Sequence, residues 1–159
     1  WGMLEWTLKG KPSVLGFCSG IVGGLVVITP ACGFVSMNSA VIMGLLGGTI
    51  PFIFVSYLKR KCGFDDALDT FGVHGVGGTL GAILSGVFAD PDISGVVAGL
   101  QDGLLVAQLK AVALTIGWSV AATVVITFVV KAVTGLRPTT EVERTGLDLA
   151  EHGEAGYEG

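Results

Sequence analysis

One histidine, His74, is the residue of this chain best suited to chemistry inside a membrane. It lies in residues 70–88, a run of otherwise apolar and small residues that is long enough to cross a bilayer. An ionisable side chain in such a run must be paired, hydrated or functional, because hydrocarbon does not solvate it. A neutral imidazole donates from one ring nitrogen and accepts at the other, so it can pass a hydrogen bond or a proton along a narrow path. His74 is therefore a candidate conducting residue, and a packed histidine is the alternative.

Two aspartates, Asp66 and Asp69, precede this run and suit the start of a helix. With Asp66 as the N-cap and Asp69 at the third helical position, both carboxylates would accept from unpaired amides and face the positive end of the helix dipole. This prediction places His74 about five residues, or about 7 to 8 Å, inside the membrane boundary.

Other reactive residue types have ordinary interpretations here. Thr29 stands before a proline at the end of an apolar run, where a threonine bonded to its own helix accounts for it. No Gly-x-Ser-x-Gly nucleophile elbow accompanies the histidine, which argues against a hydrolase and against an enzyme. The widely spaced cysteines are Cys18, Cys32 and Cys62. Their spacing does not suit a metal site, so neither a metal nor a cofactor is expected.

Hydropathy predicts the helices that must position these residues. Of the 159 residues, 51% are hydrophobic and only 14% are charged, and the 26 glycines far exceed the usual share. This composition is typical of an all-α, polytopic membrane protein, a bundle of transmembrane helices. The expected spans cover residues 14–34, 38–58, 69–88 and 106–133, within a transmembrane part of residues 1–135.

Charge indicates the orientation of these spans. Lysines and arginines lie before the first span and after the second and fourth, whereas aspartates fill the loop on the other side. Positive loops remain in the cytoplasm, so the first loop and the tail, residues 136–159, are expected on the cytoplasmic side. The tail holds six carboxylates against two arginines and the rest of the chain is neutral, which gives no basic surface for nucleic acid.

Glycines recur at four-residue spacing in the first three spans: Gly16, Gly20 and Gly24, then Gly44 and Gly48, then Gly77 and Gly81. Such spacing exposes bare backbone on one helix face and lets helices approach closely where no hydrophobic effect drives them together. These glycines are expected to form packing seams. A phosphate-binding loop would need a lysine and a preceding strand that the pattern lacks.

Several motifs follow one another along nearly the whole chain. They are Gly-Lys-Pro-Ser at residues 10–13, the run 16–34 ending in Ile-Thr-Pro-Ala-Cys-Gly-Phe, the run 69–78, and the tail motifs 135–138 and 143–154. Together, in this order, they resemble the ammonium transporter (Amt/Mep/Rh) family. The resemblance implies eleven helices, built from two inverted five-helix repeats and a long final helix. This chain would supply the end of the seventh helix and the eighth to eleventh, as the C-terminal portion of a longer protein.

The resemblance also implies transport of ammonium or ammonia through a hydrophobic pore, for nitrogen uptake. His74 would be the second of two hydrogen-bonded pore histidines, and the first would lie outside this chain. An intact ion would forfeit hydration worth on the order of several kcal/mol, so neutral ammonia would pass while the proton moves across the imidazoles. The positions that match pore-lining or inner-vestibule residues of the family are Val22, Thr29, Asp66, Asp69 and Thr70.

Assembly and partners follow from the same resemblance. The family forms homotrimers with one pore per subunit in the cell membrane, and its cytoplasmic tail couples subunits and meets the PII signal-transduction protein. The tail positions that match are Arg137, Glu143, Gly146, Asp148, His152 and Glu154. Two alternatives remain open: an ammonium sensor of the same family, and a membrane scaffold in which His74 is merely packed.

Overall fold

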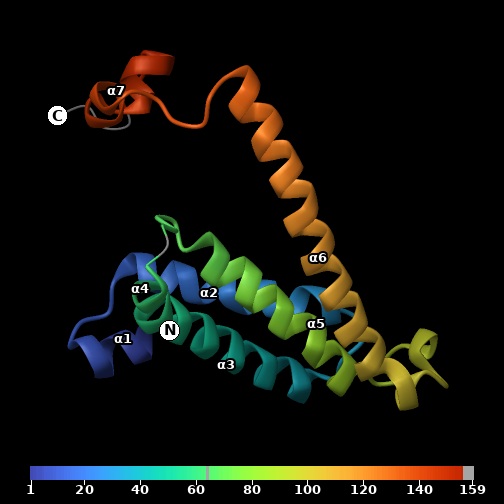
Figure 1. Cartoon of the computed structure of the whole chain (residues 1–159). Helices are drawn as coiled ribbons and strands as arrows, with labels where there is room; N and C mark the ends of the chain where they lie inside the picture. Colours follow the sequence, from blue (N-terminus) through green and yellow to red (C-terminus); the bar gives the residue numbers. More distant parts are fainter. Residues whose placement is uncertain (64, 156–159) are drawn as a thin grey trace. The chain divides into compact units, whose positions relative to one another are not determined.

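The computed structural model describes residues 1–63 and 65–155, and the regular secondary structure of this part of the chain is helical apart from one isolated bridge between Val35 and Ala89 (Figure 1). The predicted all-α class is confirmed. The chain divides into two units, Trp1–Leu114 and Thr115–Gly159. Among the residues that the structure describes, four helical stretches have the length and composition needed to cross a membrane: Val14–Ala31, Met37–Cys62, Phe71–Phe88 and Gln101–Val133.

The first unit holds most of the helices. They are α1 (Gly2–Lys9), α2 (Val14–Ile28), α3 (Met37–Ile53), α4 (Lys59–Cys62), α5 (Gly77–Phe88) and the first part of α6 (Gln101–Val133). Short 3₁₀ turns cover Thr29–Ala31 and Gly95–Val97. Wider π-helical turns, Phe54–Leu58 and Phe71–Val76, join α3 to α4 and lead into α5.

The ends of the spans differ from the expected ones because backbone hydrogen bonding, not hydropathy, decides them. Gly33 has a φ of 83°, a left-handed conformation that ends the first span before residue 34. Ser36 accepts from the Ser39 amide and starts α3 at Met37. The fourth span also starts earlier than expected. Helix α6 begins at Gln101 rather than residue 106, since the polar side chains of its first turn do not interrupt its backbone hydrogen bonds.

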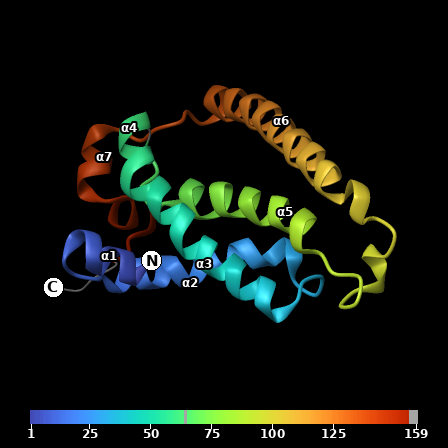
Figure 2. The ribbon, with the colours of Figure 1, turned by 90° about the horizontal axis from the view of Figure 1, so that it is seen from below.

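Helices α2, α3 and α5 lie side by side (Figures 1 and 2), and glycines make their contacts close. A Cβ on Gly23 would lie 2.6 Å from the Gly47 carbonyl oxygen, and one on Gly47 would lie 2.9 Å from the Gly23 oxygen. A Cβ on Gly81 would collide with the Val27 carbonyl oxygen of α2. Of the glycines predicted to form seams, Gly81 makes such a contact, whereas Gly24 and Gly44 meet nothing within 4 Å. The close approach of α2 to α3 is made instead by Gly23 and Gly47, which the predicted spacing did not include.

Few side chains are fully buried between these helices. Val27, Ala31 and Met43 form the small apolar core. A second cluster forms where Phe52 of α3 is fully buried, with its ring 5.5 Å from Trp1 and 6.5 Å from Tyr57. The first cluster joins α2 to α3, and the second ties the start of the chain to the other end of α3.

The second unit contains the end of α6, the short helix α7 (Thr140–Thr145) and π-helical turns at Asp148–His152. Thr139 caps α7, since its side chain accepts from the Val142 amide. No residue of α6 along its 33 residues is buried.

Candidate functional site

The cavity that contains His74 lies between α2 and the segment that leads into α5. Its volume is about 210 Å³, room for several molecules of the size of water or ammonia. Both walls are mostly apolar, and the residues that line the cavity are Leu15, Cys18, Ser19 and Val22 from α2, with Leu68, Thr70, Val73 and His74 opposite. His74 itself is exposed, so it is not packed into the core of this chain.

Three of the four residues expected to line a pore meet in this cavity: Val22, Thr70 and His74. The fourth, Thr29, is not among the residues that line it. The Thr29 hydroxyl donates to the Leu25 carbonyl oxygen of its own helix at 2.6 Å, the ordinary role of a threonine at a helix end.

Asp66 caps the helix that carries His74, as expected, but from farther away. Its Oδ2 accepts from the amides of Phe71 at 3.0 Å and Gly72 at 3.2 Å. Residues 67–69 are not helical, and the π-helical turns begin at Phe71 rather than next to Asp66. His74 therefore lies within the first turn of this helix, nearer to its start than the expected five residues.

Asp69 does not occupy the third helical position, which corrects the sequence interpretation. It has a φ of 55°, in the left-handed region, and its backbone carbonyl accepts from the Val73 amide. Its carboxylate pairs with the Lys59 ammonium group instead of capping the helix. The same ammonium group donates to the Asp66 carbonyl oxygen at 2.8 Å.

The π-helical turns around His74 pack against those that follow α3. A Cβ on Gly72 would lie 2.5 Å from Cγ2 of Val55, so only glycine allows this approach. The rings of Phe54 and Phe71 lie 5.6 Å apart beside it. Wide helical turns often occur at functional sites, and here one of them presents His74 to the cavity.

The opposite wall is held at its start by a buried glutamate, Glu5 of α1. Its Oε2 accepts from the amide and the hydroxyl of Ser13, each at 2.9 Å, and Ser13 in turn caps α2. Lys9 lies 3.4 Å from the other oxygen. Burial raises the pKa of this carboxyl, but the Ser13 hydrogen bonds and Lys9 outweigh it and the pKa falls below its usual value.

The predicted tail residues lie in the second unit. Arg137 pairs with Glu143 at 2.8 Å, and Gly146 adopts a φ of 102° that a side chain would disfavour. The Glu154 amide donates to the Asp148 carbonyl oxygen, while His152 ends the π-helical turns. A second cavity of about 340 Å³ contains Arg137 but not the other predicted tail residues; it is lined by Thr134, Gly135, Leu136, Arg137, Pro138, Leu147 and Glu151.

Sequence reasoning missed several residues around the His74 cavity. Cys18 and Ser19 line it, and Lys59 and Glu5 hold its two walls. The four-residue spacing of Cys18 and Val22 on one helix face could have indicated the first of these. Within residues 1–63 and 65–155, no group of three or more histidine, cysteine or carboxylate side chains could hold a metal ion.

Membrane-length helices around an open, largely apolar cavity with one imidazole define an integral membrane protein. A model of the Ammonium Transporter Family matches residues 1–157. Ammonium transporters of Aquifex aeolicus and Bacillus subtilis are 46% and 44% identical to this chain, over 99% of its length in each case. The chain therefore belongs to the ammonium transporter family, as the motifs predicted, and these relatives are named as transporters rather than enzymes.

Solved structures agree with the family. The crystal structure of Saccharomyces cerevisiae Mep2 matches 89% of this chain with a TM-score of 0.78 and 32% identity. A structure described as a Sensor Amt Protein matches 94% with a TM-score of 0.82 and 28% identity. The chain spans 37% and 40% of the two bacterial relatives, and 34% and 37% of the two solved chains. It is thus equivalent to a fragment of these relatives.

Proposed function

We propose that this chain forms one side of a pore that conducts ammonium or ammonia, with His74 as its central conducting residue. The observation that carries the proposal is the exposed imidazole in a cavity of about 210 Å³ that Val22 and Thr70 also line. Membership of a family of ammonium transporters supplies the substrate.

The chemistry of the cavity favours a neutral permeant. Its walls carry Leu15, Val22, Leu68 and Val73, which offer an ion no replacement for its hydration shell. An ammonium ion that leaves its proton at the mouth avoids this cost, and ammonia then crosses the apolar stretch. His74 passes the proton to a second imidazole that a segment outside residues 1–159 contributes.

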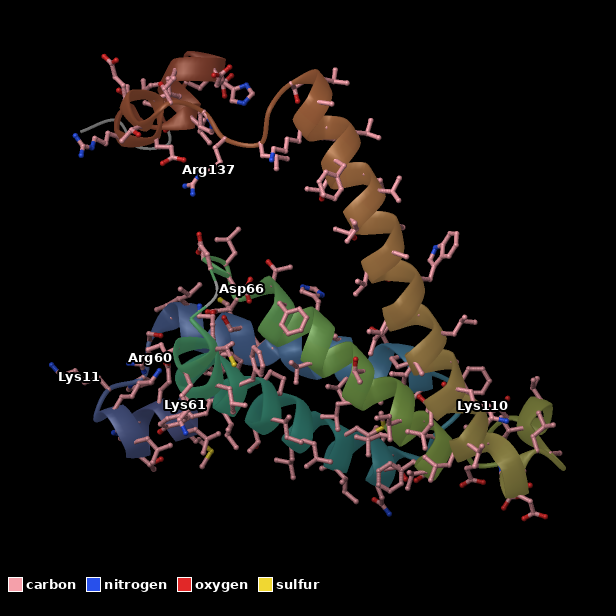
Figure 3. All side chains as sticks on the ribbon, viewed as in Figure 1. Lys11, Arg60, Lys61, Asp66, Lys110 and Arg137 are labelled. Atoms are coloured by element: carbon pink, nitrogen blue, oxygen red, sulfur yellow. The ribbon has the colours of Figure 1, made fainter. Side chains whose placement is uncertain are left out.

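The orientation and surroundings of the chain form part of the proposal. Lys11, Arg60 and Lys61 lie at one end of the first unit and Lys110 at the other (Figure 3). Positive side chains favour the cytoplasmic side of a membrane, so the end of the first unit with these three cations is the cytoplasmic one. Asp66 lies at the same end. The protein thus lies in the cell membrane and serves nitrogen uptake.

Assembly and regulation complete the proposal. Three copies form a trimer with one pore each, and the tail, held in shape by the Arg137–Glu143 pair, couples subunits and meets a PII-type signalling protein. The tail is strongly acidic, so its docking depends on charge and weakens as salt is raised.

Uptake of methylammonium by the full-length protein tests the pore. Replacing His74 with alanine should abolish or strongly change uptake while the amount of assembled protein in the membrane stays the same. Thr49→Val is the matched control. Thr49 is also a polar residue in a predicted span, but its hydroxyl donates to the Leu45 carbonyl oxygen of its own helix. Equal loss of uptake in both variants, or loss of assembly in the His74 variant, would contradict a pore role.

An ammonium sensor is the second candidate function, favoured by the TM-score of 0.82 to the Sensor Amt Protein. A sensor would bind ammonium in the same cavity with little net flux. Binding without methylammonium uptake by the unmodified protein would select this function over transport.

A further inference from the structure

The loop of residues 65–70, which precedes the π-helical turns of His74, forms part of the wall of the His74 cavity. Leu68 and Thr70 of this loop line the cavity, together with Val73 and His74 of the helix that follows. The loop and the helix turn that it leads into therefore supply half of the lining residues. Whatever holds the loop sets the shape of the cavity.

A single side chain, Lys59, holds the loop at two points. Its Nζ donates to the Asp66 carbonyl oxygen at 2.8 Å and to Oδ1 of Asp69. The side chains of Lys59 and Asp69 are 21% and 23% exposed, so water screens this pair less than a surface ion pair.

The two residues that Lys59 holds determine where the helix of His74 begins. The Asp66 carboxylate accepts from the amides of Phe71 and Gly72, which would otherwise lack partners at the helix start. Asp69 has a φ of 55°, a conformation that costs energy for any residue with a side chain and persists only when its surroundings hold it. Lys59 provides that restraint.

We propose that Lys59 is a positioning residue for the conducting site: by tying Asp66 and Asp69 to the end of α4, it holds His74 and Thr70 at the cavity. This inference rests on the proposed pore. Lys59 acts through the loop, because it is not among the residues that line the cavity.

The two cations that follow Lys59 do not share this role. Arg60 donates through Nε and Nη2 to the Ser56 carbonyl oxygen of its own helix, at 3.1 and 2.8 Å. Lys61 is exposed and takes part in none of the ion pairs found within the described residues. Lys61→Gln is therefore a matched control, since it removes the same charge two residues away.

Cys18 supplies a readout that does not depend on transport. Its side chain is exposed and lines the cavity on the wall facing the loop. In the full-length protein with its other cysteines replaced by serine, the rate at which a methanethiosulfonate reagent labels Cys18 reports the width of the cavity.

The experiment compares Lys59→Gln, Lys61→Gln and the charge exchange Lys59→Asp with Asp69→Lys. Losing one charge-assisted hydrogen bond should shift the equilibrium between the held and the released loop roughly tenfold. The labelling rate of Cys18 in Lys59→Gln should change by the same factor, and methylammonium uptake should fall. Lys61→Gln should leave both unchanged, and the exchange should restore most of the labelling rate.

Equal labelling rates in the Lys59 and Lys61 variants would overturn the proposal. If Lys59→Gln does not accumulate in the membrane, an exchanged variant that accumulates and labels like the unmodified protein supports the pair, and one that fails to accumulate overturns it. An unmodified protein without uptake would contradict the proposed pore, yet the labelling rates would still decide the role of Lys59.

Discussion

The three packed helices, α2, α3 and α5, differ from α6 in how glycine is used. In the packed helices, Gly23, Gly47 and Gly81 each meet the backbone of a neighbouring helix. In α6, a Cβ on Gly103 or Gly117 would meet nothing within 4 Å. Both kinds of helix are apolar enough to cross a membrane. The backbone of α6 is approached at Leu105, where a Cβ on Gly86 of α5 would lie 2.8 Å from the Leu105 Cα. Hydropathy therefore identifies a span, whereas a helix's own glycines at the contact distinguish α2, α3 and α5 from α6.

The comparison also explains why so little apolar area is buried between α2, α3 and α5. In a membrane no hydrophobic effect drives helices together, so close backbone contact and dispersion must hold them. A small residue at the contact is then worth more than a large apolar one. On α6 the large side chains stay exposed, as Trp118 and Phe128 do at 74% and 66%.

The largest effect that tests this comparison is expected for Gly47→Ala. The added Cβ would lie 2.9 Å from the Gly23 carbonyl oxygen, which cannot move without shifting a helix. The expected loss is about 1–3 kcal/mol of unfolding free energy, measured by thermal unfolding of the full-length protein in detergent. Gly117→Ala is the control, and its helix should gain up to about 1 kcal/mol. The same sign for both variants would refute the distinction.

A smaller effect is expected where α1 meets α2. A Cβ on Gly16 would collide with the Glu5 carboxylate and displace it from Ser13. Gly16→Ala should cost about 1–2 kcal/mol by breaking these charge-assisted hydrogen bonds. In a Glu5→Ala background the same substitution should cost almost nothing, and a double-mutant cycle of unfolding midpoints measures the difference. An equal loss of unfolding free energy in both backgrounds would show that the Glu5 carboxylate does not fill the space beside Gly16.

A further test uses the pH dependence of stability. The pKa of Glu5 is lower in the folded protein than its usual value, because the Ser13 bonds and Lys9 outweigh burial. The stabilisation is therefore complete above the usual glutamate pKa and is lost as the pH falls through the folded value. The unfolding temperature should drop more steeply below about pH 4.3 in the unmodified protein than in Glu5→Gln. Identical slopes would contradict the stabilisation of the Glu5 carboxylate by Ser13 and Lys9.

The smallest effect is expected on α6 itself. Trp118→Ala removes a large side chain that is 74% exposed, so unfolding free energy should change by no more than about 0.5 kcal/mol. Thermal unfolding of the full-length protein measures it. A loss as large as that of Gly47→Ala would instead mean that the Trp118 side chain is packed in the full-length protein, which would sharpen the comparison.

Local patterns predicted most of the fold. Apolar runs predicted four spans, and an ionisable residue in an apolar run directed attention to His74. Glycine spacing predicted close helix contacts but identified Gly81 and not the pair Gly23 and Gly47. The cap by Asp66 was also predictable, because a carboxylate near a helix start has few better partners. Asp69 was assigned wrongly because its nearness in sequence to the helix start suggested a cap, whereas Lys59, ten residues earlier, holds its carboxylate.

The sequence alone determined that this chain belongs to a membrane protein, which segments are long and apolar enough to span a membrane, and to which family it belongs, since these depend on composition and local order along the chain. Only the tertiary structure decided that Val22, Thr70 and His74 share a cavity while Thr29 does not, and that Lys59 and Glu5 hold its two walls. These contacts join residues from different elements. Their formation depends on how closely the backbones approach and on which polar groups that approach leaves to be paired.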